Sequence, residues 1–259
     1  MDLGLKDKVI IVTGGGAGIG AGISRACLAE GARVVILSRP SQNVLDFMEE
    51  MTSATCELIE INLEDTARCK AAIEQVESKY GSIYGLVNNA GVNDGCGLES
   101  GSVERFLESI NKNLTHCYAL AHYALPALKQ SQGAIVNISS KVALTGQGNT
   151  SGYAASKGAQ LALTREWAAE LLPFNIRVNA VLPAEVMTPL YARWLKTLGD
   201  PDAKLAEINS KIPLGKRMTT SAEIAAATAF LLSPTQSAHT TGQHIIVDGG
   251  YVHLDRALT

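Results

Sequence analysis

The stretch VIIVTGGGAGIG occupies residues 9–20. Its first five residues form a short run rich in β-branched side chains, which is typical of a buried strand. Glycines follow at once, and a helix is expected over residues 21–30. A strand, a glycine-rich turn and a helix N-terminus together form an anion site, because backbone N–H groups point at a pyrophosphate and glycines let it approach. An ordinary tight turn is the alternative. The cofactor contacts expected in this turn are Gly14, Gly16, Gly18, Ile19 and Gly20.

Strand patterns alternate with helical patterns along the whole chain. This alternation predicts an α/β fold, a single Rossmann-type doubly wound parallel sheet of about seven strands with helices on both faces. Ligands bind such sheets at the carboxyl ends of the strands, near the switch in strand order. The strands are expected at 9–13, 33–38, 57–61, 83–87, 134–139, 176–182 and 244–247. The helices are expected near 18–30, 42–52, 66–80, 102–130, 151–172, 189–198, 202–210 and 220–232.

The size and composition of the chain bear on its number of domains, its partners and its cellular compartment. A chain of 259 residues without a Pro/Ser-rich linker is expected to form one domain over residues 1–259. Its net charge of −3 lacks the excess of positive charge that binding to nucleic acid or to an anionic membrane requires, so neither is expected as a partner. The N-terminal apolar run is too short for a signal peptide or a membrane span. Five cysteines without a C-x-x-C pair fit a reduced compartment, so we expect a cytoplasmic protein. His116 and His122, on the helix expected at 102–130, are expected to pack or to face solvent, and they form no metal set with His239 and His244.

A tyrosine and a lysine form the most distinctive pair. Tyr153 and Lys157 stand four residues apart on the helix expected at 151–172, so their side chains share one face. An ammonium group one turn away favours the phenolate and lowers the pKa of a tyrosine, which is ordinarily about 10. Ser140, thirteen residues before Tyr153, adds a hydroxyl that can steady the reacting oxygen. The set suits proton transfer to or from an alcohol or a carbonyl. A surface pair would be the alternative without the glycine-rich turn.

Several motifs occur in one order along the chain: T-G-x-x-x-G-x-G at 13–20, NNAG at 88–91, Asn113, Ser140, Tyr153 and Lys157. Their order and spacing resemble those of the short-chain dehydrogenases/reductases, and the resemblance covers essentially the whole chain. Within that family, four further stretches resemble the bacterial L-fucose dehydrogenases: 137–141, 145–153, 183–191 and 247–258.

The resemblance implies an NAD(P)-dependent enzyme that oxidises a free aldose, L-fucose or a related sugar, at C1 to the lactone by hydride transfer. Tyr153, as a phenolate, would take the proton of the C1 hydroxyl, and Ser140 would hold the substrate oxygen. Lys157 would bond the cofactor's ribose hydroxyls, and Asn113 would hold a water that relays the proton. The resemblance also implies a homotetramer, and a substrate lid over residues 187–218, for which a surface insertion is the alternative.

The end of the second strand bears on the choice of cofactor. An acidic residue there would bind both ribose hydroxyls and favour NAD, but this chain has Ser38 followed by Arg39. An arginine can pair with a 2′-phosphate and stack on adenine, so NADP is expected and NAD is left open. Asn62 could accept from the adenine amine. The other cofactor contacts, implied by the resemblance, are Leu63, Asn89, Ala90, Gly91, Tyr153, Lys157, Pro183, Val186 and Thr188.

Polar residues gather around the catalytic ones, where a steroid or acyl chain would favour apolar residues. Glu185 could accept from two hydroxyls and Gln147 could both donate and accept, whereas Lys141 could instead pair with Glu185. A sugar is therefore the expected small-molecule substrate. Two alternatives stay open: an NADP-dependent ketone, steroid or 3-oxoacyl reductase of the same family, and a non-catalytic protein that senses a dinucleotide. The expected substrate contacts are Asn93, Ser140, Lys141, Gln147, Tyr153 and Glu185.

Overall fold

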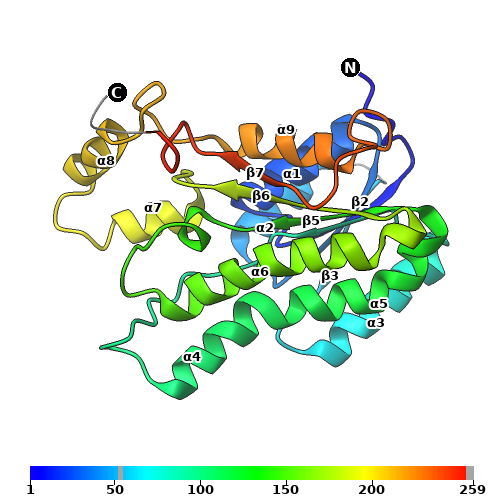
Figure 1. Ribbon diagram of the computed structural model, residues 1–259, viewed down its shortest axis with the longest axis horizontal. Coiled ribbons are helices and arrows are strands. Elements are labelled where there is room, and N and C mark those ends of the chain that lie inside the picture. Colours follow the sequence, from blue (N-terminus) through cyan, green and yellow to red (C-terminus); the bar gives the residue numbers. More distant parts are fainter. Residues whose placement is uncertain (52–54, 255–259) are drawn as a thin grey trace.

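The computed structural model describes residues 1–51 and 55–254, and at its centre lies one parallel sheet (Figure 1). The strands are β1 (Val9–Thr13), β2 (Arg33–Ser38), β3 (Cys56–Glu60), β4 (Gly85–Asn88), β5 (Ala134–Ile138), β6 (Arg177–Pro183) and β7 (His244–Val247). Their order in the sheet is β3-β2-β1-β4-β5-β6-β7. The chain therefore winds outward from the centre in both directions, which confirms the predicted doubly wound parallel sheet.

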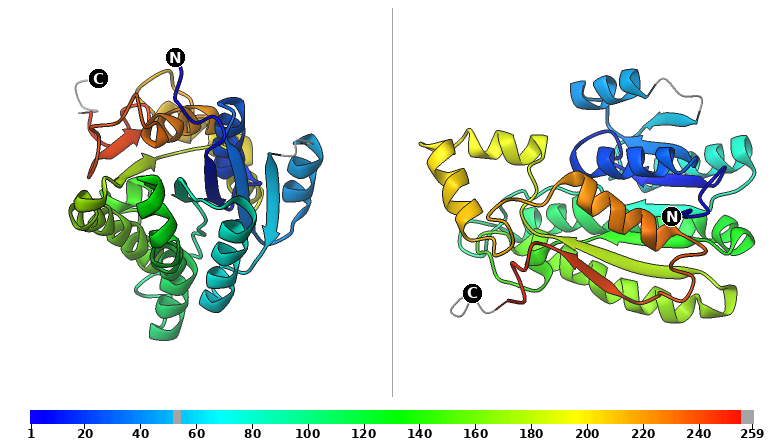
Figure 2. Two further views of the ribbon diagram at one scale, coloured as in Figure 1. Left: turned by 90° about the vertical axis from the view of Figure 1, so that its right-hand side faces the viewer. Right: turned by 90° about the horizontal axis from the view of Figure 1, so that it is seen from above.

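The helices form a layer on each face of the sheet, as Figure 2 shows. They are α1 (Gly18–Ala29), α2 (Gln42–Glu50), α3 (Thr66–Tyr80), α4 (Val103–Ile110), α5 (His116–Ser131), α6 (Ser151–Glu170), α7 (Pro189–Leu195), α8 (Pro201–Ser210) and α9 (Ser221–Leu232). Ile73, Leu120 and Trp167 pack from α3, α5 and α6 into one core, and Ile23 and Leu231 pack from α1 and α9 into the other. Strands covered on both faces are mostly apolar, and every residue of β1 and β5 is buried.

The helix predicted at 102–130 is divided, which corrects the prediction. Helix α4 ends at Ile110, a π-helical turn follows at Asn111–Thr115, and α5 begins at His116. A π turn keeps the chain helical, with i→i+5 hydrogen bonds in place of i→i+4 bonds, so the sequence pattern does not mark this division. The other predicted elements lie within a few residues of the observed ones. Residue 52, at the end of one predicted helix, and residues 255–258 lie outside the described residues.

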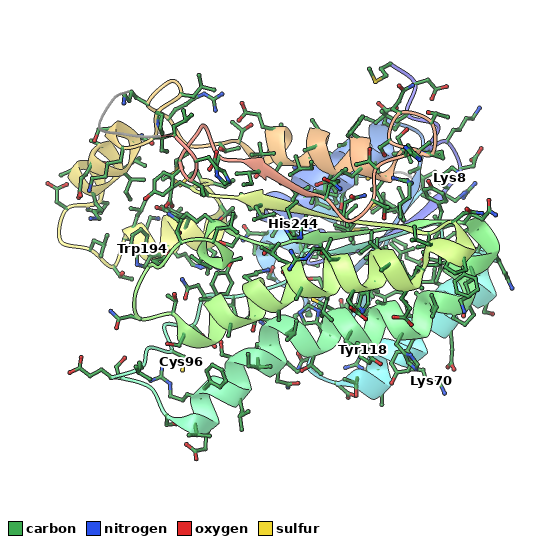
Figure 3. All side chains as sticks on the ribbon, viewed as in Figure 1. Lys8, Lys70, Cys96, Tyr118, Trp194 and His244 are labelled. Atoms are coloured by element: carbon green, nitrogen blue, oxygen red, sulfur yellow. The ribbon has the colours of Figure 1, made fainter. Side chains whose placement is uncertain are left out.

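Two short helices stand off the carboxyl edge of the sheet between β6 and α9 (Figure 1). The two ends of the segment that carries these helices are joined by a hydrogen bond, in which the Thr219 backbone nitrogen donates to the Glu185 carbonyl at 3.0 Å. Within α7, the rings of Tyr191 and Trp194 meet edge to face at 5.1 Å between centroids; Trp194 is labelled in Figure 3. Segment 187–218 is therefore an ordered projection beside the sheet edge. No helix within the described ranges is both long and apolar enough to cross a bilayer.

Candidate active site

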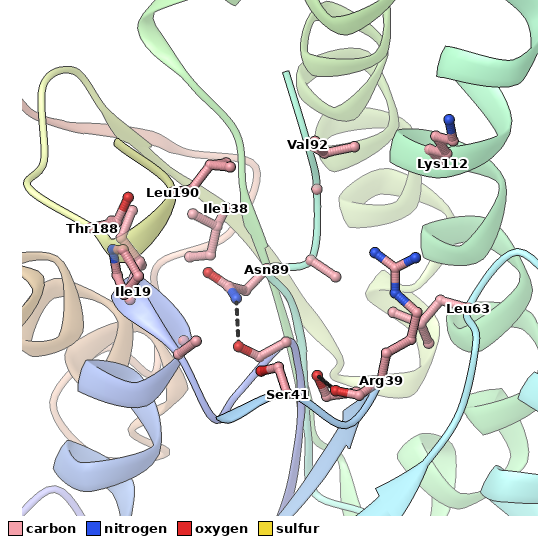
Figure 4. A pocket seen from close by; sticks show the side chains of 18 of the residues that line it. Ile19, Arg39, Ser41, Leu63, Asn89, Val92, Lys112, Ile138, Thr188 and Leu190 are labelled. Carbon is pink, nitrogen blue, oxygen red and sulfur yellow. Dashed lines mark hydrogen bonds between the residues drawn. The ribbon is translucent and has the colours of Figure 1, made fainter. Parts of the chain in front are cut away.

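A cavity of about 910 Å³ opens at the carboxyl edge of the sheet, and Figure 4 shows it from close by. The switch in strand order lies between β1 and β4, so the loops after these strands diverge and leave a crevice where ligands bind. Loops after β2, β3, β5 and β6 complete the wall. The predicted site residues that line the cavity are Gly14, Gly18, Ile19, Gly20, Ser38, Arg39, Asn62, Leu63, Asn89, Ala90, Gly91, Ser140, Tyr153, Lys157, Pro183, Val186 and Thr188.

The glycine-rich turn leaves room for an anion at the N-terminus of α1. Gly14 has a φ of +63°, a conformation that glycine adopts without strain. A Cβ on Gly20 would lie 2.1 Å from the Gly14 carbonyl oxygen, so a side chain there cannot be accommodated. Ala17, at the N-cap, has no side chain that could accept from the first-turn amides, which are left for a ligand. The cradle therefore fits the pyrophosphate of a dinucleotide.

Thr13 and Asn89 join the two loops at the switch point. Thr13 Oγ1 accepts from the backbone nitrogens of Asn89 and Ala90, both at 2.9 Å. In return, Asn89 donates through Nδ2 to the Thr13 carbonyl at 2.8 Å. These bonds hold the start of the 88–91 stretch against the end of β1. The backbone of Ala90 and Gly91 is thereby fixed at the cavity wall.

The ends of β2 and β3 form the part of the cavity that suits an adenosine. Figure 4 shows the Arg39 guanidinium extending into the cavity near Leu63. Ser38, which ends β2, donates through Oγ to the Arg39 carbonyl at 3.1 Å. Asn62 Oδ1 accepts from the backbone nitrogen of Glu64 at 3.3 Å, so it supports its own turn. A hydroxyl, not a carboxylate, therefore stands at the end of β2.

Ser140, Tyr153 and Lys157 meet at the other part of the cavity. Ser140 follows β5 and caps a short helical turn, its Oγ accepting from the Val142 nitrogen at 3.4 Å. Tyr153 lies in the first turn of α6, and the Lys157 Nζ lies 5.6 Å from the centroid of its ring. Lys157 also donates to the Ile138 carbonyl at 2.8 Å, which ties the middle of the site to β5. The structure thus brings together the three residues predicted from distant stretches.

Burial shapes the ionisation of both groups. It raises the pKa of Tyr153 above 10, and a hydrogen bond with Ser140 opposes this rise only in part. The expected depression of the tyrosine pKa is therefore wrong, because loss of hydration disfavours the phenolate more than the Ser140 hydrogen bond favours it. Burial also lowers the pKa of Lys157 to about 8, although the neighbouring Cys117 acts in the opposite direction.

Asn113 lies in the π-helical turn and is fully buried, so its side chain does not line the cavity. Its Oδ1 accepts from the Val92 nitrogen at 2.7 Å, and its Nδ2 donates to the Ser109 carbonyl at 2.9 Å. A Cβ on Gly91 would lie 3.0 Å from that Oδ1. The Asn113 side chain therefore fixes the loop after β4. The predicted relay would fall to its backbone carbonyl, which also accepts from Gln160 Nε2 at 3.5 Å.

The predicted substrate contacts divide into two groups. Ser140 and Tyr153 line the cavity, whereas the other members do not. Lys141 and Glu185 form a mostly buried ion pair beside Ser140, and the Lys141 Nζ lies 4.2 Å from the centroid of the Tyr251 ring. The predicted cofactor contact Gly16 also lies outside the cavity lining, and it packs against α2. The predicted substrate contacts that do not line the cavity are Asn93, Lys141, Gln147 and Glu185.

Some lining residues were not predicted. His116 stands three residues after Asn113, on the same helical face, and this spacing could have indicated it. Lys112 lies within the π turn and also lines the cavity, and the sequence pattern does not indicate it. Other unpredicted lining residues include Ala17, Val44, Asp94, Pro189, Leu190, Tyr191 and Arg193.

Comparison with known proteins bears on this site. Residues 14–252 match the family described as "Enoyl-(Acyl carrier protein) reductase". The chain is 36% identical over 244 residues to the L-fucose dehydrogenase of Bos taurus, covering 94% of this chain and 88% of that one. It is 35% identical to the 3-oxoacyl-[acyl-carrier-protein] reductase FabG of Thermotoga maritima, over 96% of this chain and 99% of that one.

Solved structures agree with these relatives. The crystal structure of Cj0485 dehydrogenase superposes with a TM-score of 0.95 at 46% identity, covering 100% of this chain and 99% of that chain. The aldohexose dehydrogenase AldT of Thermoplasma acidophilum superposes with a TM-score of 0.88 at 33% identity, covering 99% and 98%. The family match, the parallel sheet and the meeting of Ser140, Tyr153 and Lys157 lead to one assignment. The chain is an oxidoreductase of the short-chain dehydrogenase/reductase family, whose members use a nicotinamide cofactor.

Proposed function

We propose that this enzyme oxidises a free aldose, L-fucose or a close relative, at C1 to the lactone. The observation that carries the proposal is that Ser140, Tyr153 and Lys157 share one cavity with a glycine cradle suited to a pyrophosphate. Two relatives named for sugars, an L-fucose dehydrogenase and an aldohexose dehydrogenase, support the substrate class.

The reaction removes a hydride from C1 and a proton from the C1 hydroxyl, leaving the carbonyl of a lactone. A bound oxidised nicotinamide supplies the hydride acceptor. Tyr153 takes the proton and Ser140 holds the substrate oxygen. The Lys157 ammonium opposes the cost of burying the phenolate, and it would donate to the ribose hydroxyls of a bound dinucleotide. The Asn113 carbonyl, in the π turn, is the acceptor for a relay water on the way to solvent.

The polar groups beside Ser140 suit a sugar. Lys141 and Glu185 lie together next to the catalytic serine, with Tyr251 against the lysine. Because this pair does not line the cavity, we infer that movement of segment 187–218, acting as the lid, would bring it within reach of the hydroxyls of a sugar. Tyr191 and Arg193, on α7, already line the cavity from that segment.

NADP is the proposed cofactor. The Arg39 guanidinium extends into the cavity and can pair with a 2′-phosphate. Ser38 takes the place where a carboxylate would bind both ribose hydroxyls and repel that phosphate. A homotetramer is proposed for the assembly, for which light scattering behind size-exclusion chromatography gives the mass.

A 3-oxoacyl, ketone or steroid reductase is the second candidate, and the FabG relative favours it. The test is absorbance of reduced nicotinamide, with NADP and NAD separately, over a panel of free aldoses that includes L-fucose, a 3-oxoacyl thioester and a hydroxysteroid. Turnover of L-fucose or of aldoses that differ from it at one centre supports the proposal. Turnover of the thioester or the steroid alone would replace it with the second candidate.

A further inference from the structure

The side chain of Gln160 links the catalytic lysine to the π-helical turn. Gln160 lies three residues after Lys157 on α6, so the two side chains share a helical face. Its Oε1 accepts from the Lys157 Nζ at 3.2 Å. Its Nε2 donates to the Cys117 Sγ at 3.2 Å and to the Asn113 carbonyl at 3.5 Å. The amide therefore spans the space between α6 and α5.

The orientation of this amide follows from the neighbours. The ammonium group of Lys157 can only donate, and the Asn113 carbonyl can only accept. If the Gln160 amide were flipped, its NH₂ group would face the ammonium and its oxygen would face the carbonyl. Only the observed orientation pairs both ends, so the amide oxygen is directed at Lys157.

Every member of this arrangement is buried. Gln160 is 1% exposed, Lys157 2% and Cys117 0%. A buried polar group is unfavourable unless it is paired, and core packing alone is served equally well by an apolar side chain. The Lys157 ammonium has three hydrogens, of which Ile138 and Gln160 receive two, and the third is left for the cavity that Lys157 lines.

We propose that Gln160 is a positioning residue for Lys157, whose amide oxygen holds the ammonium group at the point from which it serves Tyr153 and the dinucleotide. The inference rests on the proposed dehydrogenase chemistry but not on the identity of the substrate. The other titratable groups that face Lys157 are Tyr153 on its own helix and His116 and Cys117 from α5.

His116 marks the far end of the same cluster. Its Nδ1 lies 3.6 Å from the Cys117 Sγ, and its buried Nε2 has no hydrogen-bond partner within the described ranges. Because His116 also lines the cavity, the cluster extends from the lysine to the cavity wall. Gln160 is the member that contacts Lys157 directly, so it is the one whose replacement isolates the effect.

Gln160→Met tests the proposal, because methionine keeps the length of the side chain and removes its amide. Thr164→Val is the matched control. Thr164 is fully buried one turn further along α6. Its hydroxyl donates to the Gln160 backbone carbonyl and accepts from the Asn137 Nδ2, and it makes no hydrogen bond with Lys157. Both variants lose buried hydrogen bonds, so a general loss of stability affects both.

The first readout is the pH profile of kcat, with any substrate that the wild type turns over. Loss of an acceptor disfavours the ammonium form. The alkaline limb of Gln160→Met should therefore move to lower pH by about half a unit or more, and kcat near neutrality should fall about tenfold. The second readout is the dissociation constant of the oxidised dinucleotide by calorimetry near pH 7 and pH 9, which should rise more steeply with pH than in wild type. Profiles and constants that coincide with those of Thr164→Val would overturn the proposal.

Gln160→Glu supplies a second test, which can be carried out even if the methionine variant does not fold. A carboxylate beside the ammonium favours its charged form, so the alkaline limb should move to higher pH. No shift, or a shift to lower pH, would contradict the proposal. A wild type inactive on every substrate would refute the proposed function, and the dinucleotide constants would still decide the role of Gln160.

Discussion

The Nζ of Lys157 donates to the carbonyl oxygen of Ile138 at 2.8 Å, which joins the middle of α6 to the last residue of β5. The bond holds a buried ammonium group beside the ring of Tyr153. It also places that group at the carboxyl edge of the sheet, where the cavity opens.

Tyr153→Phe should retain dinucleotide binding and lose turnover by about a thousandfold or more, because the variant keeps the ring and removes the group that takes the proton. Steady-state kinetics and calorimetry with the oxidised dinucleotide measure the two effects. Tyr118→Phe is the control, since this tyrosine lies on the outer surface of α5, 57% exposed (Figure 3). Substantial residual turnover in Tyr153→Phe would exclude the proton-transfer role.

Arg39→Asp should weaken NADP binding far more than NAD binding. A charged hydrogen bond contributes about 1.5–3 kcal/mol, so the NADP/NAD affinity ratio should fall by more than about tenfold. Lys70→Asp makes the same change of charge on α3, where Lys70 is exposed and paired with Glu74 (Figure 3). If both variants leave the ratio unchanged, Arg39 does not contact the 2′-phosphate.

Gly20→Ala should abolish dinucleotide binding, because the new Cβ would lie 2.1 Å from the Gly14 carbonyl oxygen and force the cradle apart. An overpacked site of this kind typically loses about 1–3 kcal/mol of stability, so the melting temperature should also fall. Gly158→Ala, in α6, meets nothing within 4 Å and should be neutral or stabilising. Normal dinucleotide affinity in Gly20→Ala would show that the turn does not hold the pyrophosphate.

Lys157 should give the stability of the protein a specific pH dependence. Burial lowers its pKa from 10.5 to about 8, so between these values the unfolded chain binds a proton that the folded chain has released. The free energy of unfolding therefore gains a contribution that rises with pH across this window. From pH 8 to pH 10.5, the free energy of unfolding of the wild type should rise by on the order of 3 kcal/mol relative to that of Lys157→Met, as measured by urea unfolding. A constant difference would show that Lys157 is not desolvated.

Local patterns in the chain were sufficient to predict the doubly wound sheet and the placement of Ser140, Tyr153 and Lys157 at one cavity. The run at 9–13 is apolar on both sides because β1 is covered on both faces, and the glycines at 14–20 follow because a turn this tight admits no Cβ. Tyr153 and Lys157 share a face by helical spacing alone. Such features depend on short-range geometry, which the order of residues specifies directly.

Other features arise only when distant elements pack. The division of α4 from α5 by a π turn, and with it the buried place of Asn113, leaves no mark on the apolar periodicity. Burial raises the pKa of Tyr153, whereas the neighbouring Lys157 was expected to lower it, because desolvation depends on everything that surrounds a group. The contact of Gln160 with Lys157 and with α5 likewise needs two helices at a fixed separation. Hydration and packing across the fold are properties of the assembled molecule, so they cannot be derived from the spacing of residues in one segment.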